Sequence, residues 1–181
     1  AAREGSAVYV IPGTVAEQGH ARAEHVLQMQ TVVVDLDAGD LTAKLAHLVH
    51  HLGAPTLLVE SGGRTAEGAA KLHAWWRLTE PAEGEDLLRL CALRGEIAEK
   101  VGGDLHFRSA HQPIRVPGTV HQKHGVQRRV IIREHRPRVE VELPDFAAAV
   151  AAMPTMPGLE APATAPGATR PGLDSLLTTP V

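Results

Sequence analysis

Short apolar runs and helical periodicities alternate along the chain and predict a mixture of strands and helices. Apolar and β-branched runs bounded by polar, Gly or Pro positions are typical of strands. Apolar residues that recur every three or four positions are typical of helices with one buried face. We expect strands at residues 7–12, 32–37, 55–60, 71–78, 126–132 and 138–143, and helices at residues 40–52, 83–100 and 145–152.

The two longer predicted helices carry their own boundary signals. Asp40 precedes the first and is a favourable N-cap, because its carboxylate accepts hydrogen bonds from backbone N–H groups of the first turn. Gly53 follows this helix and permits the left-handed conformation that ends many helices. Gly102 and Gly103 stand in the same place after the helix at 83–100. These residues therefore predict where both helices begin or end.

The composition changes after residue 152. Residues 153–181 are rich in Pro, Ala, Thr and Gly and contain few large apolar side chains. Such a segment buries too little surface to offset the entropy lost on ordering. We therefore expect one α+β domain at residues 1–152 and a disordered tail or interdomain linker at residues 153–181.

Two acidic residues end the strand predicted at 32–37. Asp35 and Asp37 point to the same face, because side chains alternate along a strand. Two like charges a few ångströms apart oppose each other's ionisation. A hard divalent cation relieves this conflict, since carboxylate oxygens are its preferred ligands. The spacing alone fits a metal site and a strand end with both acids in water equally well.

Composition excludes several classes of site. The chain has 181 residues and is 44% hydrophobic, which is enough for one sizeable core. Its single cysteine, Cys91, excludes an intrachain disulfide and a thiolate-rich zinc site, and this fits a reducing cytoplasm. No apolar run approaches the roughly 20 residues of a membrane span, and we expect no membrane partner. The chain begins with Ala rather than Met, so we expect it to be a trimmed chain or a piece of a longer protein.

The net charge of −3 conceals a basic segment. Residues 106–138 hold seven Arg and one Lys against one acid, Glu134. Such a segment attracts the phosphate backbone of a template or primer strand. The same charges also suit a solvated pair of strands.

The strand predicted at 71–78 places Lys71, His73 and Trp75 on one face and Trp76 on the other. A lone His on a strand is more often a hydrogen-bonded structural residue than a ligand. One tryptophan is expected in the core. The other makes either a second core contact or a stacking contact with a base or sugar.

Three motifs, in order, resemble those of the archaeo-eukaryotic primase superfamily. Val32-Val-Val-Asp-Leu-Asp37 resembles its first motif, a hydrophobic run followed by Asp-x-Asp. Lys71-Leu-His73, followed by Ala-Trp-Trp, resembles its second motif, in which a His ends a strand signature. Gly102-Gly-Asp104 and the downstream segment Arg115-Val-Pro-Gly-Thr-Val-His-Gln-Lys-His-Gly125 resemble its third acidic motif and the basic element that follows. The match covers about residues 7–135 and is most similar to plasmid- and phage-encoded RepB-type primases.

The resemblance implies an α+β primase-polymerase core with an RRM-like sheet and flanking helices. It implies a nucleotidyltransferase that makes or extends primers during replication of a plasmid, phage or similar element. Asp35, Asp37 and Asp104 would bind two Mg²⁺ or Mn²⁺ ions, which stabilise the attacking and leaving oxygens, and His73 would act beside them. The residues implied to bind the nucleotide are His73, Lys71, Arg115, Lys123 and His121. The implied partners are a single-stranded DNA template, nucleoside triphosphates and a helicase or accessory helical domain of the same longer protein.

The chain departs from the family pattern at two positions. Lys71 stands where the second motif usually has a small residue. The candidates to compensate are Arg64, Lys71 itself and the loop expected at Ser61-Gly62-Gly63, whose backbone N–H groups could bind an anion. Ser109 stands where many RepB-type sequences have an Asp. If that Asp is the family's third metal ligand, Asp104 is not its counterpart and activity is in question.

Two groups of histidines offer weaker metal sites. His47 and His51 are four residues apart on a predicted helix, but no Cys or acid accompanies them, and a solvated face is the simpler interpretation. His111, His121 and His124 form a second candidate zinc site, which we favour less than a role in nucleotide binding for His121.

Other functions fit the motifs less well. A haloacid dehalogenase phosphatase also begins with a strand and Asp-x-Asp, but the chain lacks its later paired acids. A rolling-circle endonuclease needs a catalytic Tyr, and Tyr9, the only tyrosine, lies in the first predicted strand. The more serious alternative is a primase-like module that binds nucleic acid or nucleotides without catalysis.

Overall fold

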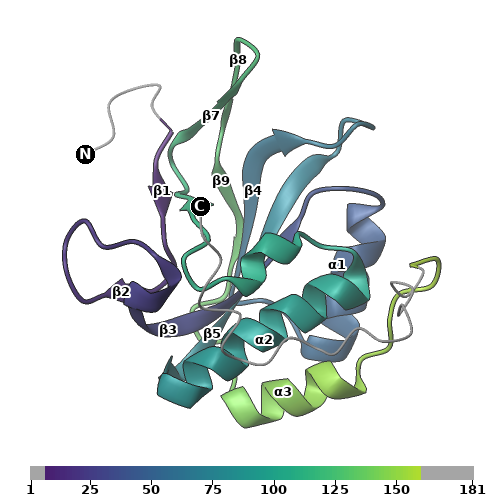
Figure 1. Ribbon diagram of the computed structural model, residues 1–181. Coiled ribbons are helices and arrows are strands. Elements are labelled where there is room, and N and C mark those ends of the chain that lie inside the picture. Colours follow the sequence, from purple (N-terminus) through teal and green to yellow (C-terminus); the bar gives the residue numbers. More distant parts are fainter. Residues whose placement is uncertain (1–6, 160–181) are drawn as a thin grey trace, which may run out of the picture.

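The computed structural model describes residues 7–159. Residues 1–6 of the predicted domain and 160–181 of the predicted tail lie outside this range. The described chain folds into a five-stranded antiparallel sheet with helices packed on one face (Figure 1). The sheet strands are β2 (Thr14–Val15), β3 (Val26–Leu36), β4 (Leu57–Arg64), β5 (Ala70–Glu83) and β9 (Ile131–His135), in the order β2-β3-β5-β4-β9, and the helices are α1 (Leu41–Leu52), α2 (Gly84–Val101) and α3 (Leu143–Ala152).

Smaller elements complete the fold. A two-stranded ladder joins β1 (Tyr9–Val10) to β6 (Ile114–Arg115), and a hairpin joins β7 (Val120–Lys123) to β8 (Val126–Arg129). Two short 3-10 helices, η1 (Ala23–His25) and η2 (Leu105–Arg108), precede β3 and follow α2. The predicted α+β class with an antiparallel sheet and flanking helices is confirmed.

Side-chain alternation along β3 divides the interior into two parts. Val32, Val34 and Leu36 face the helices and belong to the main core. Val33 and Asp35 face the opposite side, because neighbouring residues of a strand point to opposite faces. On that side a second, smaller cluster contains Val33, Phe107 of η2 and Ile114 of β6. The side of the sheet that carries Asp35 is therefore covered by short, irregular elements rather than by helices.

The two tryptophans of β5 follow the same division. Trp76 is fully buried in the main core, and its indole N–H donates to the carbonyl oxygen of Gly53. Trp75 packs against the second cluster, with its Nε1 buried and without a hydrogen-bond partner. The prediction that one tryptophan lies in the core is confirmed.

Helix ends follow the predicted signals. Asp40 caps α1, and its Oδ1 accepts hydrogen bonds from the backbone N–H groups of Thr42 and Ala43 at 3.0 Å each. Gly53 follows the last residue of α1. Gly102 ends α2 in the left-handed conformation, with φ of 61°. The third helix begins at Leu143, two residues before its predicted start.

The segment Ser61-Gly62-Gly63 continues β4, and its prediction as a loop is wrong. The strand reaches Arg64 with a shift in register after Glu60. Gly62 has φ of 77°, and a Cβ atom there would lie 2.6 Å from the Cβ of His121 on β7. The absence of a side chain thus lets the β7–β8 hairpin lie directly against β4, an effect that local sequence does not reveal.

The predicted strands at 126–132 and 138–143 also differ from the structure. The first is divided between β8 and β9 at Val130, which is fully buried. Within the second, Val141 forms a single parallel bridge with Leu78, and no strand is assigned in this described stretch. The N–H and carbonyl of Val141 bond with Arg77 and Thr79 of β5, and Thr56 Oγ1 donates to the carbonyl of Val139.

Residues 153–159, the described part of the predicted tail, lie against the domain. Met153 is buried in the main core, and the N–H of Met156 donates to the carbonyl of Lys100 at 2.8 Å. The carbonyl of Pro154 lies 2.9 Å from Nε2 of His47 on α1. The packed part of the chain therefore continues beyond residue 152. None of the helices within residues 7–159 is long and apolar enough to cross a membrane.

Candidate active site

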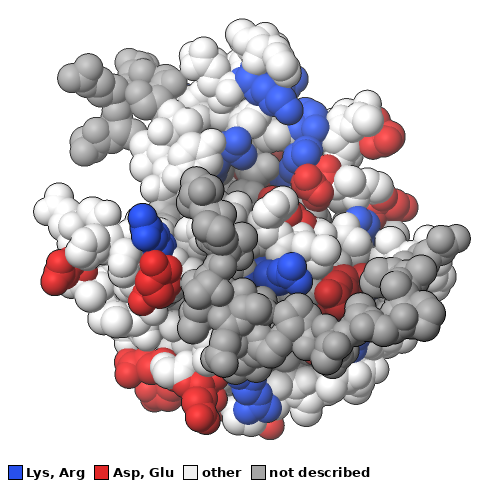
Figure 2. All heavy atoms as spheres, viewed as in Figure 1, with Lys and Arg blue, Asp and Glu red and all other residues white. Residues whose placement is uncertain are grey.

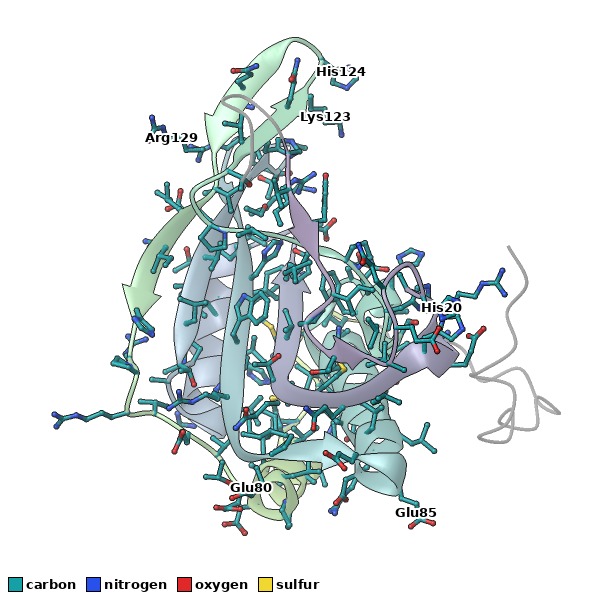
Figure 3. The ribbon with its side chains drawn as sticks, turned by 90° about the vertical axis from the view of Figure 1, so that its left-hand side faces the viewer. His20, Glu80, Glu85, Lys123, His124 and Arg129 are labelled. Carbon is teal, nitrogen blue, oxygen red and sulfur yellow. The ribbon has the colours of Figure 1, made fainter. Side chains whose placement is uncertain are left out.

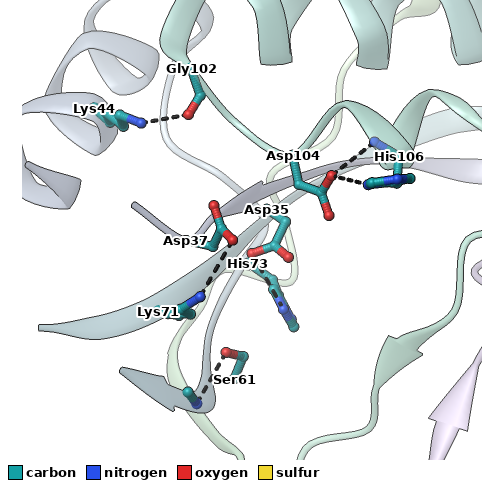
Figure 4. A network of polar contacts seen from close by, with 10 residues as sticks. Asp35, Asp37, Lys44, Ser61, Lys71, His73, Gly102, Asp104 and His106 are labelled. Atoms are coloured by element: carbon teal, nitrogen blue, oxygen red, sulfur yellow. Dashed lines mark hydrogen bonds and ion pairs between the residues drawn. The ribbon is translucent and has the colours of Figure 1, made fainter. Parts of the chain in front are cut away.

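The two acidic residues of the first motif lie at the end of β3. Asp35 is paired across the sheet with His73 of β5, and Asp37 follows the strand (Figure 4). The closest approach between the paired side chains is 3.8 Å, from Nε2 of His73 to Oδ1 of Asp35. Asp37 forms an ion pair with Lys71, in which Oδ2 and Nζ are 3.4 Å apart. The first two motifs thus form one site on neighbouring strands.

The third acid reaches this site through the end of α2. The backbone N–H of Asp104 donates to the carbonyl oxygen of Asp35 at 3.1 Å. Gly103 makes this approach possible, because a Cβ atom there would lie 3.0 Å from the same oxygen. Oδ1 of Asp104 accepts from the N–H of His106 and lies 2.7 Å from its Nδ1. The structure therefore brings Asp104 to Asp35, as predicted, while one of its oxygens also caps η2.

Asp35 lies in an environment that disfavours its charge. Burial raises its pKa to about 7, with further contributions from the negative charges of Asp37 and Asp104. The cations Lys71 and Arg115 act in the opposite direction without cancelling this effect. Oδ1 of Asp35 is buried and has no hydrogen-bond partner in the protein. This oxygen is available to a ligand, and a positive one would restore the charged carboxylate.

His73 is held in its neutral form. Its side chain is only 4% exposed. Burial, together with the positive charge of Arg115, lowers its pKa to about 4. Nδ1 is buried without a partner, and Nε2 is the atom that faces Asp35. The imidazole therefore offers one donor and one acceptor near pH 7.

Cationic side chains border the acids. Arg115 lies with its guanidinium carbon 5.2 Å from the ring centre of Tyr9, and its Nε is buried without a partner. His121 is buried on β7, also with an unpaired Nδ1. Burial lowers its pKa, and the neighbouring charges of Arg115, Lys123, Arg128 and Lys71 lower it further. Arg115 and Lys71 form the positive rim of the site, and the largely uncharged ring of His121 lies beside them.

Of the five residues predicted to bind nucleotide, four lie around the acids, namely His73, Lys71, Arg115 and His121. Lys123 is placed elsewhere, near the end of the β7–β8 hairpin (Figure 3). Ser109 does not extend the acidic group, because its hydroxyl lies 2.6 Å from Nδ1 of His111. A separate apolar pocket, lined in part by Val10, Ile11 and Pro113, contains none of the acidic residues.

Two buried cations near the site were not found from the sequence. Lys44 of α1 donates from Nζ to the carbonyl of Gly102 at 2.5 Å. Its pKa is lowered by burial and raised by the charge of Asp37. Arg94 of α2 is fully buried and lies 5.6 Å from the ring centre of Phe107 in η2. Both residues occupy the apolar face of their helices, and helical spacing from buried leucines is the signal that identifies them.

The donor atoms at the site suit a hard cation. Within residues 7–159, no group of three or more His, Cys, Asp or Glu side chains is arranged closely enough to hold a metal ion. This finding also applies to the histidine groups at 47–51 and 111–124. Asp35 nevertheless has a buried oxygen without a partner, and Asp37 lies on the same side of the strand end. Mg²⁺ commonly uses one or two carboxylates together with water and substrate phosphates, so these residues fit such an ion.

One solved structure of a primase-polymerase domain shares this fold, and two primase structures have lower similarity to it. The AEP domain (PP-N190) of the primase-polymerase PrimPol of cyanophage S-2L is similar with a TM-score of 0.61 and 16% identity, over 78% of this chain and 69% of that one. A crystal structure of primase RepB′ has a TM-score of 0.49 and 21% identity, over 71% and 41% of the two chains. The catalytic domain of RepB′ in complex with initiator DNA has a TM-score of 0.47 and 20% identity, over 68% and 60%.

Only the structural comparison found proteins similar to this chain. No protein-family model matches the chain, and no curated protein matches it. The likeness to the cyanophage domain extends over more than three quarters of this chain and rests on the arrangement of strands and helices. The chain therefore has the fold of an archaeo-eukaryotic primase domain, as its three motifs implied.

Proposed function

We propose that this chain is a nucleotidyltransferase of the primase or primase-polymerase type, which joins nucleoside triphosphates on a single-stranded DNA template. The observation that carries the proposal is the convergence of Asp35, Asp37 and Asp104 beside His73 and Arg115. Three acids concentrate negative charge, and the neighbouring groups with unpaired N–H positions are suited to phosphate. The primase fold of the cyanophage domain supports the same assignment.

In this proposal, Asp35 and Asp37 would hold the divalent cation, Mg²⁺ or Mn²⁺. Asp104 does not form a three-carboxylate group with them in this structure, and it would become the third ligand when a cation binds. When bound, such ions stabilise negative charge on the attacking hydroxyl oxygen and on the leaving pyrophosphate. The raised pKa of Asp35 supports this role, because burial and the negative charges of Asp37 and Asp104 disfavour its ionised form, which a bound cation would stabilise.

The positive rim orients the nucleotide. Neutral His73 donates one ring N–H to a phosphate oxygen, and Arg115 presents a planar pair of donors. Lys71 and His121 complete this group, and Lys71 exchanges its ion pair with Asp37 for a phosphate contact. Lys123, at the end of β7, contributes a positive charge to nucleotide binding at a greater distance from the acids. This division of roles places triphosphate binding on β5, β6 and β7, opposite the acids of β3.

The alternative is a primase-like module that binds nucleotides or DNA without catalysis. Ser109, which stands where many RepB-type sequences have an acid, is the observation that favours it. The two proposals differ in one outcome, because only the first requires phosphodiester bond formation.

The test is incorporation of labelled nucleotides on single-stranded DNA with Mg²⁺ or Mn²⁺. We compare the chain with Asp35→Asn/Asp37→Asn and with a matched control, Glu80→Gln/Glu99→Gln, whose carboxylates are exposed on the surface. Synthesis that disappears in the first variant and persists in the control supports the proposal. Binding of nucleotide and DNA by the unmodified chain without any synthesis supports the module instead.

We further propose that the chain acts in replication of a plasmid, phage or similar element, as part of a longer protein with a helicase or accessory helical domain. The cyanophage origin of the similar domain supports the first part. We expect cells that carry Asp35→Asn/Asp37→Asn to lose replication of the resident element. Cells that carry the control variant Glu80→Gln/Glu99→Gln should retain it.

A further inference from the structure

The β7–β8 hairpin extends away from the sheet and carries cations on exposed positions (Figure 3). All of residues 122–129 are exposed. The chain turns at His124 and Gly125, which both have positive φ, as a two-residue hairpin turn requires. The exposed cations are Lys123, Arg128 and Arg129. No Asp or Glu occurs between Asp104 and Glu134, so these charges have no acid within their own segment.

The base of the hairpin is fixed against the sheet. Gly62 of β4 faces His121, and a Cβ atom at Gly62 would also lie 3.1 Å from the carbonyl oxygen of Arg128. His121 and Arg128 are cross-strand partners in the hairpin. The backbone of β4 therefore contacts both strands of the hairpin, which places the hairpin relative to the acids of β3.

Positive charge continues from the hairpin to the acids. His121 is surrounded by Lys123 and Arg128 of the hairpin and by Lys71 and Arg115 of the site, and all four charges act on its imidazole. Lys71 and Arg115 in turn act on Asp35. Figure 2 shows Lys and Arg side chains that extend from the top of this view down to a group of Asp and Glu side chains. The cations thus form one continuous strip.

We propose that the β7–β8 hairpin binds the phosphate backbone of a single nucleic-acid strand that passes the carboxylate site. This inference rests on the proposed function for the course of the strand. Exposed cations without neighbouring acids in their own segment suit a polyanion. Val126 is an isolated exposed apolar side chain among them, so the hairpin has little surface for an apolar partner.

The test is the salt dependence of binding to a labelled single-stranded DNA of mixed sequence, measured by fluorescence anisotropy. The variant Lys123→Gln/Arg128→Gln/Arg129→Gln removes three charges from exposed positions. The control Arg22→Gln/Arg89→Gln/Arg138→Gln removes three exposed charges elsewhere. Equal melting temperatures of the three proteins establish that the variants fold.

We expect the hairpin variant to bind DNA about tenfold more weakly or worse, with a slope of log K against log salt reduced by about 2, since each phosphate contact on a single strand contributes about 0.7. The control keeps the affinity and slope of the unmodified chain. Equal losses in both variants, no loss in the hairpin variant, or no DNA binding by the unmodified chain would each overturn the inference.

Two further measurements test DNA binding by the hairpin independently of the proposed nucleotidyltransferase activity. Asp35→Asn/Asp37→Asn should abolish synthesis and still bind DNA through an intact hairpin. A hairpin variant with unchanged DNA affinity, in a protein that still synthesises, would refute the role of the hairpin alone. Preferential binding of a polyglutamate peptide over DNA would indicate an acidic protein partner and also overturn the inference.

Discussion

Asp35 and His73 face each other across β3 and β5, and the atoms that approach most closely, Oδ1 and Nε2, are 3.8 Å apart. The distance is too long for a hydrogen bond, and each side chain has a buried polar atom without a partner. Burial moves the two pKa values in opposite directions, to about 7 for Asp35 and about 4 for His73. His73 is therefore uncharged around neutral pH, and Asp35 changes from mostly protonated to mostly ionised as the pH rises through about 7.

Asp35→Asn should change how stability depends on pH. The pKa of Asp35 is about 7 in the folded chain against 3.8 as its ordinary value. Between these values the unfolded chain has lost a proton that the folded chain retains, so the free energy of unfolding falls as pH rises and stays lower above pH 7. Asn has no proton to lose. We expect the variant to match the unmodified chain near pH 4 and to exceed it at pH 8 by up to about 4 kcal/mol.

Denaturant unfolding in the presence of a chelator, at intervals from pH 4 to pH 8, measures this difference. Glu80→Gln is the control, because that carboxylate is exposed. The other groups that titrate in this range, including His73, are present in both proteins, so the comparison isolates position 35. Parallel curves for the unmodified chain and Asp35→Asn would show that the carboxyl group at position 35 has an ordinary pKa.

Divalent cations should stabilise the chain. A cation that binds the folded state alone raises the melting temperature in proportion to the logarithm of its concentration above the dissociation constant. We expect Mg²⁺ and Mn²⁺ to raise the melting temperature more at pH 8 than at pH 6, because Asp35 is largely protonated at the lower pH. Differential scanning fluorimetry measures the shift.

Two variants test whether the rise in melting temperature with Mg²⁺ or Mn²⁺ comes from the carboxylate site. Asp35→Asn/Asp37→Asn should lose the shift, and Glu80→Gln/Glu99→Gln should retain it. A shift of the same size in both would place the cation elsewhere on the chain.

Replacing His73 by Ala should weaken nucleotide binding. A hydrogen bond to a charged group contributes about 1.5–3 kcal/mol, and we expect KM for the nucleoside triphosphate to rise by about tenfold or more. Since the pKa of His73 is about 4, its ionisation should not make KM depend on pH between 6 and 8. Steady-state kinetics at fixed DNA concentration measures both quantities. An unchanged KM with a reduced kcat would assign His73 to the chemical step or to support of Asp35 instead.

Lys44 should act as a positioning residue for Asp104. Its Nζ donates to Gly102, two residues before that acid. Lys44→Met keeps the apolar part of the side chain and removes the donor, which should lower the free energy of unfolding by about 1–3 kcal/mol. We also expect a smaller melting shift with Mn²⁺ and a lower kcat, because the loop that carries Asp104 is less constrained.

Lys100→Met is the control for Lys44. Lys100 also donates to a backbone carbonyl at 2.5 Å, that of Val150 in α3, outside the carboxylate site. It should lose comparable stability and keep the full cation shift. If both variants lose the shift equally, Lys44 has a structural role only.

Local signals predicted the helices well and the sheet less well. The N-cap Asp40 and the glycines Gly53 and Gly102 act through their own backbone, so their effect can be read from the sequence. The strand β4 passes through Ser61-Gly62-Gly63 because the hairpin approaches there, and such a tertiary contact leaves no periodic pattern. Ser and Gly in a strand resemble a turn until the neighbouring element is known.

The positions of site residues could be predicted where a sequence motif coincides with the alternation of side chains along a strand. Asp35 and His73 lie on strands with clear alternation, and the structure pairs them directly. Lys44 and Arg94 were missed because a charged residue in a helix is ordinarily assigned to the solvated face. Their positions relative to Leu48 and Leu90, at spacings of four residues, place them instead on the buried faces.

The hydrogen bond between the backbones of Asp104 and Asp35 joins β3 to the segment that immediately follows α2. The helix has 18 residues and is about 27 Å long. Because a helix is stiff, we expect a displacement of Asp35 on ligand binding to be transmitted to the far end of α2, where Gly84 follows the last residue of β5. A probe attached near residue 85 should therefore report occupation of the carboxylate site from the other end of α2.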